Sequence, residues 1–453
     1  MREIINLELH ARPYVRFHGP AHVLHLSFLH DHLELISGDT GVKELLTALG
    51  LRATYQAERH GIYAGDVPGV GHLVFTRARH TSYTSFTFYL YGLKEAYQPY
   101  EPFDFDLMTL LPPGWLDTRR GDLLNAVRLS VMTEDGAPPS FDRIADYFDR
   151  NVLTANQVMG GAGTVWSDFR LAKDGFGRML LVVREMSRHE LGRTVQRLLN
   201  VEDYYHLVLA PLSWARELQP SLAEAENRLN EAMKAISRAE EMPDKRLRLG
   251  ELMALAVEVE HDLALLNVRL SPAFSYCALL KTSFDELREV KVQGLLPMSV
   301  FVLRRVSPAV RTYTSLQDRL EAMSRHVARA ADLLRTSIEL NLSEQNQRLL
   351  TRLDERAKIQ LRLQETVEGL SVIAISYYAV GLIGYSLKGV HALGWHFNPD
   401  ATLAGLLPVV VGTVWLGGQA LRRQHRLSKQ RVGGSNPTSS RPIHQEASPS
   451  NSR

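Results

Sequence analysis

The chain has 453 residues, of which 45% are hydrophobic and 23% charged, a balance typical of a globular protein and not of a disordered one. Its net charge of +2 gives no general reason to expect nucleic acid as a partner. Cys277 is the only cysteine, which excludes an internal disulfide and a cysteine-rich zinc site.

The N-terminus lacks the pattern of a secretory signal. Glu3 and Glu8 interrupt the first ten residues, and no apolar run follows them. The N-terminal part is therefore expected to stay in the compartment where it is made.

Residues 1–210 are predicted to form a mixed α/β domain. Leu24, Leu26 and Phe28 alternate with other residues, as on one side of a strand, and residues 81–91 are rich in β-branched and aromatic side chains. Further strands are expected at 127–131, 165–171 and 178–183, the last two joined by a turn at Asp174-Gly175. Helices are expected at 40–49, 141–150 and 188–209.

Residues 211–365 are predicted to be helical. Ser221 and Glu224 have the spacing of a capping box, so a helix is expected to begin after Pro220 and to reach about Glu241. Helical character continues over 245–268 and 273–291, with breaks predicted at Pro243, Pro272 and Pro297, and a long helix is expected from about Ser307.

A heptad pattern runs along this long helix. Apolar residues recur at alternating spacings of four and three, and the pattern partly resumes further on (Leu316, Leu320, Met323, Val327, Ala330 and Leu334, then Leu342, Leu349 and Leu353). They could form a coiled-coil stalk that joins copies of the chain or binds a protein partner through 221–365. Alternatively, they pack on helices 221–291 of the same chain, and the number of such helices favours this second interpretation.

Residues 366–421 are predicted to form a transmembrane hairpin of two helices. The runs 369–387 and 401–421 contain no charged residue. At about 1.5 Å per residue, a helix as long as the first run covers roughly 28 Å, close to the thickness of the bilayer core. A turn is expected at 388–400, which contains Gly394, Asn398 and Pro399.

The flanking charges orient this hairpin. Basic residues precede the first run and follow the second, whereas the loop contains only Lys388 (Arg348, Arg352, Arg356, Lys358 and Arg362 before; Arg422, Arg423, Arg426, Lys429 and Arg431 after). By the positive-inside rule, both termini are expected to be cytoplasmic and loop 388–400 external, in the inner (plasma) membrane. The tail, 422–453, is basic at first and is expected to be disordered from Gly433.

The chain contains no diagnostic catalytic, cofactor-binding or metal-binding signature, and no such residue is assigned. His22, His30 and His32 could bind a metal only from one strand face, and on a strand His22 and His25 would point to opposite faces. The glycine-rich run 160–163 lacks the ending of a P-loop and more simply allows a close approach before a strand.

Several segments resemble a bacterial family of uncharacterised membrane-anchored proteins, the domain-of-unknown-function family numbered 3422. They lie at 8–13 (ELHARP), 25–26, 168–170 (DFR), 174–176, 196–199, 304–305, 308–309, 360–364, 367–371 and 375–378. The resemblance implies a membrane anchor and no established activity. It marks His10 and Arg12 for testing, and Asp168 and Arg170 are a second pair of candidates, forming either a polar site or the solvent side of a hairpin.

The expected fold is therefore α+β, with a mixed α/β domain, a helical or coiled-coil region and a two-helix membrane anchor. The favoured function is a membrane-anchored cytoplasmic binding or scaffold protein with the lipid bilayer as a partner. A two-span ion channel of the CorA layout is an alternative, although residues 384–389 lack its Gly-Met-Asn signature and neither span contains an acidic residue. An enzyme in the α/β domain is a third hypothesis, tested by mutating His10, Arg12 or Asp168.

Overall fold

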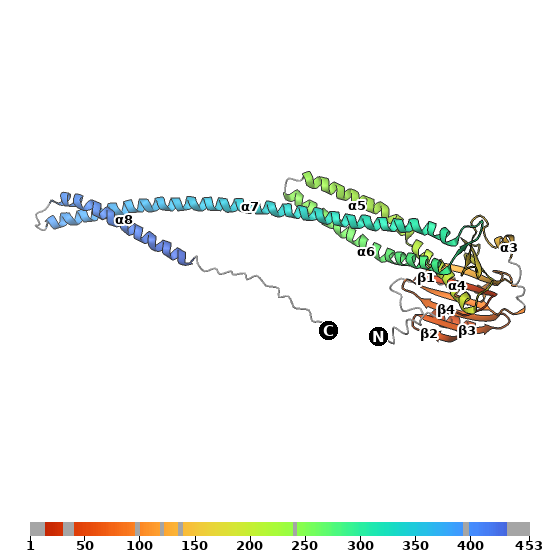
Figure 1. Ribbon diagram of the computed structural model, residues 1–453. Helices are drawn as coiled ribbons and strands as arrows, with labels where there is room; N and C mark the ends of the chain where they lie inside the picture. The colour runs from red at the N-terminus through yellow and green to blue at the C-terminus, as the bar shows by residue number, and fades with distance from the viewer. Residues whose placement is uncertain are drawn as a thin grey trace, which may run out of the picture. The chain divides into compact units, whose positions relative to one another are not determined.

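The computed structural model describes residues 14–29, 40–95, 100–117, 122–134, 139–238, 242–392 and 398–432. The chain forms two compact units, Met1–Ile338 and Glu339–Arg453. The first contains a sheet and several helices, and the second contains the end of one long helix and all of another (Figure 1). The sheet domain and large helical region predicted from the sequence are therefore confirmed.

Ten strands of the described residues form one sheet, in the order β10-β7-β8-β9-β6-β1-β5-β4-β3-β2. The strands are β1 Ala21–Leu29, β2 Arg52–Gln56, β3 His60–Val67, β4 Gly71–Arg79, β5 Tyr83–Tyr91, β6 Leu123–Thr133, β7 Thr154–Val158, β8 Gly163–Leu171, β9 Gly177–Val183 and β10 Val290–Lys291. Neighbouring strands are antiparallel except β6 and β9, which are parallel. The predicted turn between β8 and β9 is confirmed, and its Gly175 has a φ of +82, which a glycine adopts without strain.

The two faces of the sheet have different partners. Because side chains alternate along a strand, Leu24 and Leu26 of β1 face one core, whereas Val23 and His25 face the other. On the first face lie α2 (Thr40–Leu49), the 3-10 helix η2 (Leu107–Leu110) and α3 (Phe141–Ala145). The second face is covered by α4 (Arg188–Leu209), and its apolar core continues into the remaining helices of the first unit.

Helix α4 begins at a complete capping box, in which Ser187 and Glu190 satisfy each other's backbone N–H groups. Gly192 in its second turn allows the chain near Val15 to pass very close, because a Cβ at Gly192 would lie 2.0 Å from the Val15 carbonyl oxygen. At the other end, the Tyr313 hydroxyl donates to the Val208 carbonyl at 2.8 Å, one of the last carbonyls that the helix itself leaves unpaired.

Three helices pack together beyond the sheet, namely α5 (Leu212–Arg238), α6 (Met242–Leu287) and the first part of α7 (Met298–Ala392). Figure 1 shows them side by side, and polar bonds cross between them, from Arg319 to Glu226 and from Ser324 to Glu260. The six heptad residues from Leu316 to Leu334 are all buried in the core of this unit. The heptad pattern therefore packs within one chain up to this point, as the favoured interpretation expected.

Three predicted helix boundaries were wrong, two at prolines and one at the start of the long helix. Pro220 lies inside α5, Pro272 inside α6 and Pro308 inside α7, which begins at Met298 instead of about Ser307. A proline inside a helix costs about 3 kcal/mol, but buried residues on both sides, such as Leu270 and Ala273 around Pro272, offset that cost. The break predicted at Pro297 is confirmed, since the Met298 N–H is bonded to Asn156 Oδ1 of β7 at 2.6 Å.

The remaining predicted elements agree with the structure, apart from small shifts of their ends. Helices 40–49 and 188–209 are confirmed, whereas the helix expected at 141–150 ends at Ala145. It stops early because the following residues form turns, and the Asp149 N–H binds the Asp168 carboxylate at 2.9 Å instead of a helical carbonyl. Strands β2, β3, β4, β7 and β10 were not predicted.

By length and apolar composition, three described helices could cross a membrane, namely stretches of α6 (Met242–Leu287), α7 (Met298–Gly389) and α8. Helix α8 covers Pro399–Val432 and contains Pro408. The tail from Gly433 lies outside the described residues.

We expect Leu320→Ala to lower the free energy of unfolding by about 2–5 kcal/mol, because Leu320 is 1% exposed in the core of the first unit. Leu333→Ala in the same helix is the matched control. Leu333 is 70% exposed, so the change should stay within about 0.5 kcal/mol. Urea unfolding of the full-length chain, followed by tryptophan fluorescence, measures both. A Leu320→Ala cost that disappeared on dilution would indicate packing between chains instead.

Candidate functional site

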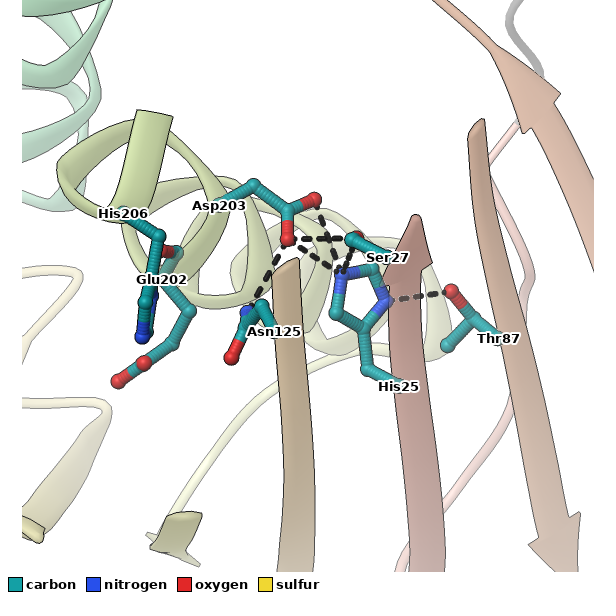
Figure 2. A network of polar contacts seen from close by, with 7 residues as sticks. All are labelled: His25, Ser27, Thr87, Asn125, Glu202, Asp203 and His206. Atoms are coloured by element: carbon teal, nitrogen blue, oxygen red, sulfur yellow. Dashed lines mark hydrogen bonds and ion pairs between the residues drawn. The ribbon is translucent and has the colours of Figure 1, made fainter. Parts of the chain in front are cut away.

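A polar network lies buried between α4 and the sheet (Figure 2). Its members are His25 and Ser27 of β1, Thr87 of β5, Asn125 of β6 and Asp203 of α4, and each is buried. The sheet register brings the four strand residues together: His25 lies opposite Thr87, and Ser27 lies opposite Asn125.

Asp203 is the centre of this network. Ser27 Oγ donates to Asp203 Oδ1 at 2.6 Å, and Asn125 Nδ2 donates to the same oxygen at 3.1 Å. His25 Nε2 lies 3.0 Å from both carboxylate oxygens, while its Nδ1 lies 2.8 Å from Thr87 Oγ1. One helical carboxylate is thus bonded to side chains of two neighbouring strands.

The network keeps Asp203 ionised in spite of its burial. Burial by itself raises the pKa of this carboxyl, but the attraction of His25 and the hydrogen bonds from His25, Ser27 and Asn125 outweigh it. The net pKa lies below its ordinary value. The hydroxyl–imidazole–carboxylate chain from Thr87 to Asp203 has the components of a proton relay, but the Ser27 and Thr87 hydroxyls are buried and already bonded. Its evident role is to attach α4 to the sheet.

Glu202, the preceding residue, has the opposite electrostatic character. It is also buried, and burial raises its pKa to about 8, helped by the nearby charges of Asp203 and Asp168 and opposed by a hydrogen bond from Tyr205. The Tyr205 hydroxyl donates to Glu202 Oε2 at 2.9 Å, and His206 Nδ1 donates to the Glu202 carbonyl at 2.8 Å. At neutral pH one acid of this pair is therefore protonated and the other ionised.

A narrow polar cleft adjoins the network on the side of β3, β4 and β5. Its volume is about 150 Å³, and its lining includes His25, Thr87, His60, Gln196 and Asn200. This is below the range of about 300–1,000 Å³ that is usual for ligand pockets.

A larger cavity of about 330 Å³ lies where β8, α4 and α7 meet. Its walls are mostly apolar or aromatic, with three charged residues among them (Val152, Asp168, Phe169, Arg170, Tyr205, Leu209, Phe301, Val302, Arg305 and Val306). Its volume, its apolar walls and its few polar groups are those of a small-molecule site.

A bulge in β8 shapes this cavity. The register with β9 shifts between Ser167 and Leu171, and Phe169 adopts a φ of +53. A bulky side chain in this left-handed region costs about 1–3 kcal/mol. The strain is held by side-chain bonds: Asp168 accepts from the Arg170 and Asp149 N–H groups, and Ser167 Oγ accepts from the Phe169 N–H.

The Phe169 ring belongs to an aromatic group. Its centroid lies 4.9 Å from that of Phe301, with the rings stacked, and 5.8 Å from that of Tyr205. The Arg305 guanidinium lies over the Phe301 ring, 3.5 Å from its centroid.

The structure brings together two of the four candidate residues. Asp168 and Arg170 both line the 330 Å³ cavity: Asp168 is a buried acceptor for backbone N–H groups, and Arg170 is an exposed residue paired with Asp149 at 2.6 Å. His10 and Arg12 lie outside the described residues, as do His30 and His32. Residues 304–305, singled out by the resemblance, contribute Arg305 to this same cavity.

Several other residues that the sequence singled out lie among the described residues. His22 and His25 face opposite sides of the sheet as expected, and burial beside Tyr100 and Phe105 lowers the pKa of His22 to about 4. Residues 159–162 join β7 to β8, and a Cβ at Gly163 would lie 3.0 Å from the Val182 carbonyl, so the run permits a close approach. Cys277 is buried in α6. Among the described residues, no group of three His, Cys, Asp or Glu side chains could hold a metal.

Sequence reasoning missed most of this site. It gave no role to Asp203, Asn125 or Tyr205, and it named Phe169 and Arg305 only as part of the resemblance. One signal was available: two acids directly precede three aromatic rings in the helix that covers the sheet (Glu202, Asp203, Tyr204, Tyr205 and His206), and acidic side chains are seldom fully buried.

Comparisons with known proteins give one match. The sequence model of a family described as "Protein of unknown function (DUF3422)" matches residues 1–425. Neither the curated proteins nor the solved structures contain a significant match.

We expect Asp203→Asn to lower the free energy of unfolding by about 2–5 kcal/mol, because three buried donors lose their shared charged acceptor. Asp66→Asn is the matched control: Asp66 forms a His–Asp pair with His72 at 2.7 Å, but its side chain is 86% exposed, so the cost should be at most about 1 kcal/mol. Urea unfolding of the full-length chain measures both. Equal costs would contradict a special role for the buried pair.

We expect Glu202→Gln to stabilise the protein at pH 8.5 and to change little at pH 5. The pKa of Glu202 is about 8 in the folded state, above the usual 4.5, so the folded state binds the proton more tightly. The contribution of Glu202 to the free energy of unfolding therefore falls as the pH rises from 4.5 to 8. This loss of stability is at most about 1.4 kcal/mol per pH unit, and a glutamine, which does not titrate, removes it. Unfolding free energies at pH 5, 7 and 8.5 test this. A variant that lost the same stability at all three values would contradict it.

Proposed function

The chain belongs to the DUF3422 family of proteins of unknown function, and from this premise and the geometry of its first unit we propose that it is a membrane-anchored binding protein. The first unit binds a small ligand in the cytoplasm, and the hairpin of α7 and α8 anchors it in the inner (plasma) membrane.

The observation that carries the binding function is the 330 Å³ cavity beside the β8 bulge. One wall of this cavity is the aromatic residue Phe169, whose backbone is strained. Strained residues cluster at ligand sites, and they persist only where the surrounding structure holds them in place. Segments 168–170 and 301–306, distant in the chain, meet there. A binding site needs this arrangement, whereas a simple anchor does not.

Support for the anchor comes from the apolar surface of the second unit. The uncharged runs 369–387 and 401–421 lie in α7 and α8, and their large apolar side chains are mostly exposed, among them Leu370, Ile373 and Leu382. A bilayer would cover such a surface. A Cβ at Gly384 would lie 3.2 Å from a methyl group of Leu403, a close approach that suits packing of α7 on α8 through small residues.

Helix α6 is not needed as a third span. Its apolar residues include Leu252, Leu255, Val259 and Leu266, and these are buried in the core of the first unit. One apolar side of α6 is thus already covered by protein, whereas Met253, Val257 and Val268 are exposed. The hairpin alone, with basic residues before and after it, then has both ends in the cytoplasm by the positive-inside rule.

A second copy of the chain or another protein is a proposed partner for α7. Beyond the part buried in the first unit, the resumed heptad residues Leu349 and Leu353 are exposed. Apolar residues at heptad spacing suit a coiled-coil partner.

Single-cysteine labelling tests the anchor and its orientation. Cys277→Ser removes the only cysteine, after which Asn398→Cys reports on the loop and Ser428→Cys on the basic end. With a membrane-impermeant maleimide on intact cells, we expect labelling at residue 398 only, and labelling at residue 428 after permeabilisation. Recovery of the chain in the soluble fraction, or labelling at 428 from outside, would contradict the proposal.

A further inference from the structure

The chemistry of the 330 Å³ cavity defines a class of ligand, an inference that rests on the proposed binding function. Six apolar residues and the ring of Tyr205 form most of its lining, so the body of a bound molecule meets aromatic and branched surfaces. Three rings line the cavity, and Phe169 contacts both of the others, Phe301 and Tyr205. Such walls favour a flat aromatic body over a linear chain, because rings gain offset-stacked and edge-to-face contacts.

The three charged side chains at the cavity differ in the partners that the protein gives them. Both Asp168 oxygens accept backbone N–H groups, and Arg170 donates to Asp149. Arg305 is different: its Nη1 donates to the Phe301 carbonyl at 3.0 Å, and among the described residues no carboxylate pairs with it. The lining itself contains two arginines and one aspartate, and the cation without a carboxylate partner is Arg305, on an exposed side chain of α7.

The position of Arg305 also prepares it to bind an acid. Its guanidinium lies 3.5 Å from the centre of the Phe301 ring, so its plane is held by stacking. A stacked guanidinium still has N–H groups along its edge, and these match the two oxygens of a carboxylate. The same phenylalanine thus orients the cation and forms part of the apolar wall.

We propose that this cavity binds a small aromatic carboxylate, with its acid group at the Arg305 guanidinium and its ring among Phe169, Phe301 and Tyr205. Arg170 lines the same cavity, but its charge is offset by Asp149, so the acid group is assigned to Arg305. The ligand is thus an anion whose apolar part is compact enough for a cavity of about 330 Å³.

Calorimetric titration of the full-length chain in lipid nanodiscs tests this, with empty nanodiscs as the blank for partition into lipid. The probes are 3-phenylpropionate, its neutral analogue 3-phenylpropan-1-ol, and octanoate. We expect 3-phenylpropionate to bind saturably and at least about tenfold more tightly than the alcohol, since a charge-assisted bidentate pair is lost in the alcohol. Octanoate should bind more weakly than 3-phenylpropionate.

Two neighbouring arginines provide a matched pair of variants. Arg305→Gln should weaken 3-phenylpropionate binding at least about tenfold and leave the alcohol unchanged. Arg304→Gln removes the same charge one residue away, from an exposed side chain outside the lining, and should leave both affinities unchanged. Val152→Trp, at a half-buried lining position, fills the cavity and should abolish binding of both probes.

Several results would overturn the inference. Equal affinity for acid and alcohol, tighter binding of octanoate, or an equal loss in Arg304→Gln would each rule out an aromatic carboxylate held by Arg305. In these cases the cavity would still bind a ligand, and the proposed binding function would remain. Absence of saturable binding for all three probes would reject both the ligand class and the cavity as the binding site.

Discussion

The buried carboxylate of Asp203 is the interaction on which the arrangement of the first unit depends. An ionised side chain inside a protein is tolerated only when hydrogen bonds and opposite charge replace its water, and leaving it unpaired costs several kcal/mol. Here the replacement comes from β1 and β6 together, through His25, Ser27 and Asn125. Because these donors lie on adjacent strands, Asp203 can be satisfied only in one position of α4 over the sheet.

That position determines the surroundings of the neighbouring cavity. Tyr205 and Leu209 lie on α4 within two turns of Asp203, so fixing the helix also fixes one wall. The opposite wall comes from the β8 bulge, where Asp168 and Ser167 hold Phe169 in a strained conformation. The start of α7, which is fixed by the Asn156 bond to Met298, supplies Phe301 and Arg305. The polar bonds are structural, and the apolar cavity that they shape is the proposed ligand site.

The apolar periodicity of the helices has two different causes. In α6 and in α7 up to Ile338, one apolar side of each helix is buried by neighbouring helices of the same unit, while single residues such as Leu333 are exposed. Beyond residue 338, α7 keeps apolar residues at similar spacing, but Leu349, Leu353 and Leu370 are exposed. Hydropathy alone makes α6, α7 and α8 equal candidates for a membrane span. Burial distinguishes them by degree: 33% of the most apolar stretch is buried in α6, against 6% in α7 and 0% in α8.

The sequence by itself determined the features that depend on local chemistry. Alternation in β1, the turn at Gly175, helix α4 and the break at Pro297 follow from residue pattern and turn propensity, and each was predicted correctly. Tertiary structure decided the rest. Pro220, Pro272 and Pro308 lie inside helices because buried neighbours outweigh local propensity. The bonds of Asp203 join residues 176 and 178 positions apart, and the Phe169 ring stacks on Phe301 of a distant helix. No local pattern contains such long-range pairings, so only the folded chain shows where its candidate site lies.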